Sequence, residues 1–152
     1  MRKAIIFMGL IVFVLAYAGC AEKQITKSEG TASTSEQAVS QGSSALSDIN
    51  FDFDKSNIRP GDGQILSDHA AFLLKNKHAK IVIEGNCDER GTAKYNLALG
   101  DRRAKEAKKY LVNAGVDSKR IKTISYGKER PLDPGHDEDA WAKNRRDHFV
   151  VK

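Results

Sequence analysis

The chain has 152 residues, of which 40% are hydrophobic and 30% charged, and its net charge is +5. This length predicts one domain of ordinary size, and two cysteines and four histidines without regular spacing exclude a disulfide scaffold and a zinc framework. The lysines are mixed with acidic residues and form no basic stripe with interleaved aromatics, so we expect no nucleic-acid partner, no metal and no cofactor.

Residues 1–19 have the pattern of an export signal. Arg2 and Lys3 precede the apolar stretch from Ala4 to Ala16, and small residues follow it. The apolar run is shorter than the ~20 residues that normally span a bilayer, which favours a cleaved signal peptide over a retained transmembrane helix. This segment holds two positive charges and no negative charge, so the chain after it carries +3.

The small pair Ala18-Gly19 stands directly before Cys20. This arrangement resembles the lipobox of bacterial lipoproteins, in which Cys20 carries the lipid and begins the mature protein. Ala21 follows the cysteine, and the resemblance associates a residue other than Asp there with transfer to the outer membrane. Because Tyr17 stands where the lipobox usually has Leu, an ordinary signal peptide with an incidental Cys20 is the alternative. A lipid at Cys20 would anchor the protein to the membrane.

The segment from Ala21 to Ser47 is rich in Ser, Thr, Gln, Glu and Gly and has no aromatic residue and no sustained periodicity. This composition is typical of a flexible tether, with a span of roughly 30 Å as a coil and at most about 90 Å when stretched. We therefore divide the chain into a signal peptide (1–19), a lipidated cysteine and tether (20–47) and a folded domain (48–152). Within the domain, Cys87 is expected to be a packing residue at a strand end.

The folded part alternates strand and helix patterns, beginning where Ile49, Phe51 and Phe53 alternate with polar residues. Strands that alternate with helices predict an α+β fold of order β-α-β-α-β-β, a two-layer sandwich in which helices pack on one face of a mixed sheet. The expected elements are strands near 49–53, 80–84, 120–126 and 149–151, a helix opening at Pro60-Gly61, a long helix over 93–113 and a short helix near 139–143.

The long helix is expected to bury a stripe of Leu97, Ala104 and Leu111, which repeat every seven residues. Gly100 interrupts this helix at a cost of about 1 kcal/mol relative to Ala, which suggests a close backbone approach, although drift is nearly as good an explanation. The cluster 137–139 is acidic and suits a helix start better than a cation site, because it lacks the alternating ligands of a calcium loop.

The candidate site lies between the third expected element and the long helix. Asp88 stands in a glycine turn, and helical phase places Asn96, Leu99 and Arg103 on a second stripe beside the core stripe. An acid and a base that face one cleft suit a zwitterionic ligand, because Asp88 accepts from an ammonium and Arg103 offers a planar fork to a carboxylate. The alternative is structural: Asp88 caps the turn, and Arg103 forms a surface ion pair with Asp88 or Asp101.

Several separated motifs occur in one order along the chain: 51–55, 87–92 followed by 95–96, 99–104, 125–129 and 144–146. In these motifs the chain resembles the peptidoglycan-associated lipoproteins of the OmpA-like C-terminal domain family. The resemblance implies noncovalent binding of peptidoglycan through the meso-diaminopimelate of an uncrosslinked stem peptide, without catalysis. It also implies a place at the outer membrane, facing the periplasm, and a TolB-like partner in the Tol-Pal system, which supports envelope integrity and constriction during division.

The resemblance also assigns site residues. Asp88 and Arg103 occupy the family's positions for the ammonium and the carboxylate, and Asn86 replaces the histidine that the family commonly has beside them. The other positions that match the family's pocket or its terminal Asn-Arg-Arg element are Phe53, Asp54, Asn96, Leu99, Asn144 and Arg145.

Two rival functions remain at this point. A flagellar-stator-type protein shares this kind of wall-binding domain but retains a transmembrane helix. A periplasmic wall hydrolase would use Asp88 and Glu89 as paired carboxylates, yet neighbours in an extended segment point to opposite faces, and no nucleophile-base pair accompanies them. We therefore expect a binding protein and no enzyme.

Overall fold

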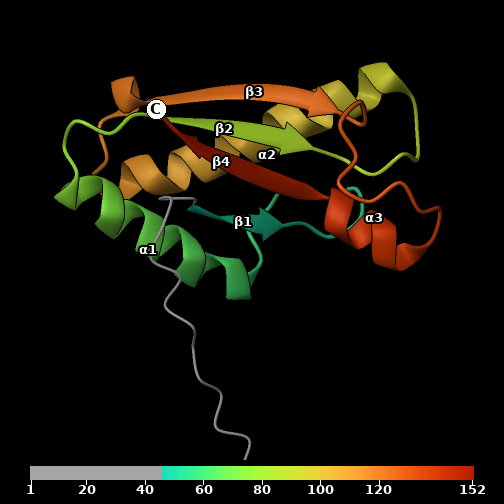
Figure 1. The fold of residues 1–152 in the computed structure, drawn as a ribbon, viewed down its shortest axis with the longest axis horizontal. Coiled ribbons are helices and arrows are strands. Elements are labelled where there is room, and N and C mark those ends of the chain that lie inside the picture. The colour runs from blue at the N-terminus through green and yellow to red at the C-terminus, as the bar shows by residue number, and fades with distance from the viewer. Residues whose placement is uncertain (1–45) are drawn as a thin grey trace, which may run out of the picture. The chain divides into compact units, whose positions relative to one another are not determined.

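The computed structural model describes residues 46–152, which form a four-stranded sheet with three helices (Figure 1). The signal peptide, the lipidation of Cys20 and nearly all of the predicted tether lie outside the described residues. Among residues 46–152, none of the helices has the length and hydropathy needed to cross a membrane. The elements are β1 (Leu46–Asn50), α1 (Pro60–Lys75), β2 (Ile81–Asn86), α2 (Ala93–Asn113), the 3-10 turn η1 (Ser118–Arg120), β3 (Ile121–Gly127), α3 (Glu138–Asn144) and β4 (Arg146–Val151).

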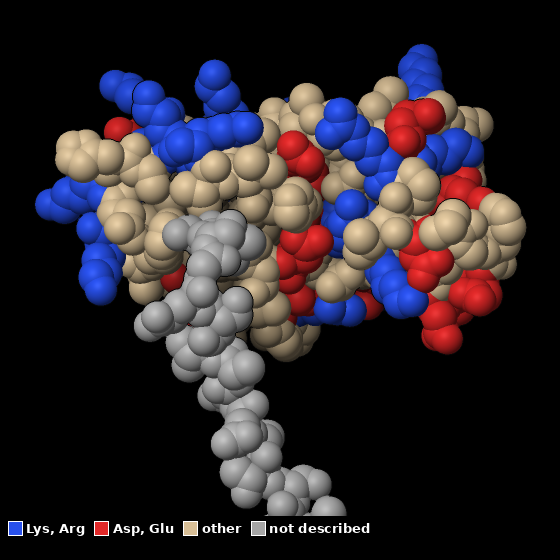
Figure 2. Space-filling view, viewed as in Figure 1, with Lys and Arg blue, Asp and Glu red and all other residues tan. Residues whose placement is uncertain are grey.

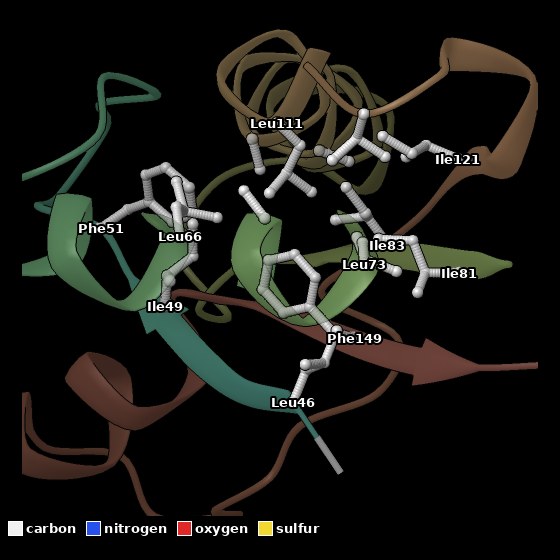
Figure 3. Packing of buried hydrophobic residues seen from close by; sticks show 14 residues of the cluster. Leu46, Ile49, Phe51, Leu66, Leu73, Ile81, Ile83, Leu111, Ile121 and Phe149 are labelled. Carbon is white, nitrogen blue, oxygen red and sulfur yellow. The ribbon is translucent and has the colours of Figure 1, made fainter. Parts of the chain in front are cut away.

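The sheet has the strand order β1-β4-β2-β3, with β2 and β3 parallel and the other pairs antiparallel. Side chains of α1 and α2, among them Leu66, Leu73 and Leu111, pack onto the same sheet face as Ile83 and Phe149 (Figure 3). The α+β sandwich with helices on one face of a mixed sheet is therefore confirmed. The short helix α3 lies at one end of the sheet (Figure 1).

The first strand begins earlier than the sequence pattern predicts. Leu46 is already paired with Phe149 of β4, so the expected domain start at residue 48 falls inside β1. The strand also ends sooner, because the chain turns after Phe51 and Asp54 has a φ of 56°. Phe53 is consequently 55% exposed and does not continue the buried face, which leaves its ring available at the end of the sheet.

The long helix α2 spans the predicted residues, and Thr92 caps it by accepting a hydrogen bond from the backbone N–H of Tyr95. Its predicted core stripe is wrong at Leu97, which is 44% exposed, while Ala104 and Leu111 are buried. The backbone of Leu97 lies against Gly127, the last residue of β3, so this turn of α2 lies over the end of the strand.

The glycine in α2 confirms the predicted close backbone approach. A Cβ built on Gly85 would lie 2.0 Å from the carbonyl oxygen of Gly100, and a Cβ on Gly100 would lie 2.4 Å from Ser125 Oγ. The backbones of β2 and α2 are therefore in direct contact. This contact brings the first turns of α2 to the end of β2.

The core also contains a histidine without a polar partner. Both ring nitrogens of His69 lack a hydrogen bond within the described residues, and the ring packs edge-on against Phe149 with 4.5 Å between centroids. Burial lowers the pKa of His69 from 6.5 to about 4. Protonation would therefore place an unpaired charge in the core.

We predict that this histidine makes the fold sensitive to acid. Between pH 6.5 and about 4 the unfolded chain binds a proton at residue 69 that the folded chain does not, so stability falls as the pH falls through this window. The loss amounts to about 3 kcal/mol at the lower end. Urea denaturation of the wild type and His69→Leu across this window should show a smaller acid loss in the variant. Parallel pH profiles would contradict the prediction.

Candidate functional site

A cavity of about 150 Å³ opens where β2 ends and α2 begins. Six of the predicted site residues line it, and Cys87, Arg90, Gly91 and Tyr95 complete the lining. The loop after β1, the loop between β2 and α2 and the first turns of α2 thus enclose one site. The six predicted lining residues are Phe53, Asp54, Asp88, Asn96, Leu99 and Arg103.

Arg103 is fully buried at the base of this cavity and donates to three backbone carbonyls. Its Nε donates to Lys55 O at 2.9 Å, its Nη1 to Asn86 O at 2.9 Å and its Nη2 to Asp52 O at 3.1 Å. These bonds tie the loop after β1 to the end of β2. A guanidinium has five N–H donors, and Nη1 also donates to Cys87 Sγ at 3.5 Å, so one N–H on Nη2 remains for a ligand.

The burial of Arg103 contradicts the structural alternative of a surface ion pair. Its hydrogen bonds go to backbone oxygens and to Cys87 Sγ. Asp101 instead pairs with Lys105, at 2.7 Å. Cys87 is buried directly after β2, as expected for a packing residue at a strand end.

Asp88 lies on the other side of the cavity with an ionised carboxyl group. Its Oδ2 accepts from Arg90 Nη2 at 2.7 Å and from Arg145 Nη1 at 3.3 Å, while Oδ1 accepts from the backbone N–H of Arg90 at 3.2 Å. Burial acts to raise the pKa of Asp88, but the hydrogen bonds from the two arginines outweigh it and hold the pKa below its usual value. The second lone pair of Oδ1 is free to accept from a ligand.

Sequence reasoning missed Arg90. Its guanidinium lies between two rings, 4.0 Å from the centroid of Phe53 and 4.2 Å from that of Trp141, and it also pairs with Glu138 at 3.5 Å. Stacking on two aromatic faces fixes a cation in place. The sequence around Arg90 does not indicate this contact with two rings, which we call the clamp on Arg90, because Trp141 comes from α3.

The terminal Asn-Arg-Arg element supports the site from outside the cavity lining. Arg145 bridges Asp88 and Glu138 and donates through Nε to Phe51 O at 3.0 Å. Asn144 accepts from the backbone N–H of Leu132, at 2.7 Å, and holds the loop before α3. The structure therefore places Arg145 against the back of Asp88 and Asn144 in a different contact.

The acidic cluster before α3 starts that helix, as predicted. Asp137 is the N-cap residue, and its Oδ1 accepts from the backbone N–H of Ala140 at 2.8 Å. Among residues 46–152 there is no group of acidic, histidine and cysteine side chains that could hold a metal ion.

Asn86 lies outside the cavity lining. Its side chain is buried and donates to Glu84 O at 2.9 Å, while its backbone oxygen accepts from Arg103. The bond to Arg103 thus uses a backbone oxygen that any residue would supply, and the side chain that replaces the expected histidine does not reach the cavity. Glu89 points away from Asp88 and accepts from His136 and Trp141 at 2.8 to 2.9 Å, so the two carboxylates do not form a hydrolytic pair.

The mouth of the cavity is formed by Tyr95 and Asp54, which come from α2 and from the turn after β1. The Tyr95 hydroxyl donates to Asp54 Oδ1. Tyr95 and Phe53 are both among the exposed large side chains. A ligand that enters the cavity would thus pass between an aromatic rim and a carboxylate.

Comparison with known proteins places these features in a family. Residues 50–145 match the OmpA family. The chain is 42% identical to the peptidoglycan-associated lipoprotein of Pasteurella multocida over 146 residues, which cover 96% of this chain and 95% of that protein. It is 52% identical to the Haemophilus influenzae protein of the same name over 98 residues, which cover 64% of each chain.

Solved structures agree with this result. The peptidoglycan-associated lipoprotein from Burkholderia pseudomallei is 41% identical, with a TM-score of 0.68 over 69% of this chain and 89% of that chain. The C-terminal domain of MotB from Helicobacter pylori has a TM-score of 0.66 over 70% of this chain and 84% of that chain. At 22% identity, the second likeness concerns the fold alone.

Proposed function

This chain belongs to the OmpA family and to its peptidoglycan-associated lipoproteins, and from this membership we propose that it binds peptidoglycan noncovalently through the diaminopimelate of an uncrosslinked stem peptide. The cavity between Asp88 and Arg103 carries the proposal. Asp88 Oδ1 would accept from the ammonium, the remaining Nη2 N–H of Arg103 would bind the carboxylate, and Leu99 offers an apolar floor to the methylene chain. No bond is made or broken in such a complex.

The support behind Asp88 suits this role. Arg90 and Arg145 keep its carboxyl group ionised and fixed before a ligand arrives, so less ordering is required on binding. Asn96 donates through Nδ2 to Arg90 O at 2.9 Å and thereby fixes the loop that carries Asp88. We assign Asn96 and Arg145 to positioning of the ligand-binding groups.

Co-sedimentation of the full chain, in detergent, with purified peptidoglycan tests the proposal. We expect Asp88→Asn to weaken binding roughly tenfold to a hundredfold, because it removes one charge-assisted contact. Asp101→Asn removes the same charge from the exposed side of α2 and should bind like the wild type. Thermal melts must show that both variants fold. Equal binding by all three proteins would reject the assignment of Asp88.

The remaining parts of the proposed function concern location and partners. We propose that a lipid at Cys20 anchors the chain in the outer membrane and that residues 20–47 tether the domain, so that the protein links the membrane to the wall. Palmitate labelling at Cys20 separates this function from a stator-type protein, which would keep its N-terminal segment. The family membership also supports a place in the Tol-Pal system with a TolB-like partner, where the protein would contribute to envelope integrity and constriction during division.

A further inference from the structure

We propose that the end of the sheet opposite the cavity docks on a membrane surface that contains anionic phospholipid. We call this region the cationic end and define it by Lys80, Lys119, Arg120, Lys122 and Lys152. The proposal rests on the lipid anchor in the proposed function, because the anchor is what would bring the domain to a membrane. It concerns residues that the cavity does not include.

Three of these lysines stand at the ends of neighbouring strands. The backbones of Lys80 and Lys152 bond to each other at 2.8 and 3.5 Å, and Lys122 is in register with Val82. Ile81 next to Lys80 faces the core, and strand residues alternate between faces, so Lys80, Lys122 and Lys152 point to the sheet face that carries no helix. All three are exposed, and none pairs with a carboxylate among residues 46–152.

Arg120 gives the cationic end a fixed charge. Its guanidinium donates to Ala79 O at 2.7 Å, to Asn76 O at 2.7 Å and to Leu73 O at 3.0 Å. It lines a hollow of about 300 Å³ together with the four lysines, Ile81 and Val82. The positive charges therefore surround a preformed depression instead of being spread over a convex surface.

Apolar side chains continue this surface along the sheet. Val82 and Val150 are opposite each other on β2 and β4, on the face without helices, and both are half-buried. Ile124 of β3 lies on the same face and is 40% exposed. Lysines beside aliphatic side chains suit a membrane interface, since the ammonium groups reach phosphates while the aliphatic parts lie against the headgroup region.

The direction of the strands places Leu46, the first residue that the structure describes, toward the same end of the sheet as the cationic end. Leu46 is paired with Phe149, and Phe149 lies roughly 10 Å along β4 from Lys152. The cavity lies beyond the other end of β2. In Figure 2 the left end, where β2 and β3 begin, shows Lys and Arg with little Asp or Glu, whereas the middle and the right show residues of both charges.

The placement of the cationic end and the cavity at opposite ends of the sheet fits a domain that faces the membrane with one end and the wall with the other. A lipid at Cys20 would hold the domain near the surface, and a high effective concentration makes even weak contacts effective. Each lysine near an anionic surface adds attraction that falls off within a Debye length, so the contact would be reversible and sensitive to salt. The cavity would remain open toward the wall while the cationic end is docked.

The test uses the chain from residue 21 onward, which lacks Cys20 and so measures the cationic end without the anchor. This chain keeps the hydrophobic core that the structure describes, whose residues all lie within 46–152. It is mixed with sedimentable vesicles of phosphatidylcholine alone or of phosphatidylcholine with phosphatidylglycerol. We expect binding only to the second kind, and its loss at high salt.

Two triple variants test which lysines are responsible for binding to the anionic vesicles. Lys80→Gln, Lys122→Gln and Lys152→Gln together should weaken binding to the anionic vesicles on the order of a hundredfold. Lys94→Gln, Lys105→Gln and Lys109→Gln change the net charge equally on exposed positions of α2 and should have a small effect. Equal losses in both variants, or no binding by the unsubstituted chain, would overturn the proposal.

Peptidoglycan binding by the same variants separates this proposal from the proposed function. Both triple variants should co-sediment with peptidoglycan like the unsubstituted chain, and Asp88→Asn should still bind anionic vesicles. If the strand-end lysine variant lost peptidoglycan and kept the vesicles, the lysines would belong to wall binding and the membrane proposal would be wrong. If Asp88→Asn bound both peptidoglycan and anionic vesicles like the unsubstituted chain, only the assignment of Asp88 to peptidoglycan binding would be wrong.

Discussion

Gly85→Ala is expected to destabilise the fold by about 4 kcal/mol or more, because the new Cβ would lie 2.0 Å from the carbonyl oxygen of Gly100. That neighbour is backbone of α2 and cannot rotate away. The helix as a whole would have to move from β2, and its shift would open the core around Ala104 and Leu111. For a domain of this size, such a loss lowers the melting temperature by tens of degrees.

Gly61→Ala is the matched control, since no atom lies within 4 Å of a Cβ at this position in the first turn of α1. It should leave the urea midpoint unchanged or raise it slightly. Gly100→Ala offers a second check, because its nearest obstacle is Ser125 Oγ at 2.4 Å. Adding Ser125→Ala should recover part of that loss. A urea midpoint for Gly85→Ala close to that of Gly61→Ala would show that the two backbones are not in contact.

The sequence predicts one partner of this contact, Gly100, but not the other. Gly100 stands out because glycine is unfavourable inside a helix, but its partner Gly85 is a strand residue whose neighbour depends on how α2 crosses the sheet. The bounds of α2 were predictable for the opposite reason: Thr92 and Gly115 are local signals at the two ends of one periodic segment.

The cavity residues differ in the same way: those close together in the sequence were predictable, and those from distant elements were not. Asn96, Leu99 and Arg103 lie on one helix, so their helical phase indicated a common side, and Asp88 stands in the turn before that helix. The clamp on Arg90 was not predictable, because Phe53 precedes α1 and Trp141 lies in α3. Aromatic side chains brought together from the two ends of a domain leave no periodic pattern in the sequence.

The exposed Leu97 illustrates the limit of helical periodicity. Its phase on α2 is within about 20° of that of Ala104, which is fully buried. Periodicity gives the direction of a side chain but does not tell where the sheet beneath it ends. Here β3 ends at Gly127, against the backbone of Leu97, so this turn of α2 lies over the end of the strand.

The second large effect is expected at Arg103, whose removal should cost stability as well as binding. Arg103→Ala removes a fully buried side chain and leaves the carbonyls of Lys55, Asn86 and Asp52, in buried or partly buried bonds, without their donors, and we expect a loss of about 3 to 5 kcal/mol in the free energy of unfolding. Arg103→Lys should recover only part of this loss, because an ammonium lacks the planar fork that reaches all three oxygens. Urea denaturation measures both losses.

The neighbouring Arg102→Ala is the control, since Arg102 is exposed and its contact with the Tyr95 ring spans 5.9 Å. It should change the free energy of unfolding by less than about 0.5 kcal/mol. An Arg103→Ala protein as stable as Arg102→Ala would mean that the three carbonyls find other donors, and Arg103 would then be free to act as a ligand-binding group alone.

The two predicted ligand-binding residues, Asp88 and Arg103, should therefore respond differently to mutation. Asp88 is held by two arginines, and Asp88→Asn keeps an acceptor for them, so the variant should lose affinity for peptidoglycan while it stays folded. Arg103 joins the loop after β1 to the end of β2, and the cavity is lined by that loop and by the loop that follows β2. Loss of peptidoglycan binding in Arg103→Ala would thus combine a disturbed cavity with the loss of the contact to the carboxylate, and Arg103→Lys, if it stays folded, is the variant that measures the contribution of the guanidinium to binding.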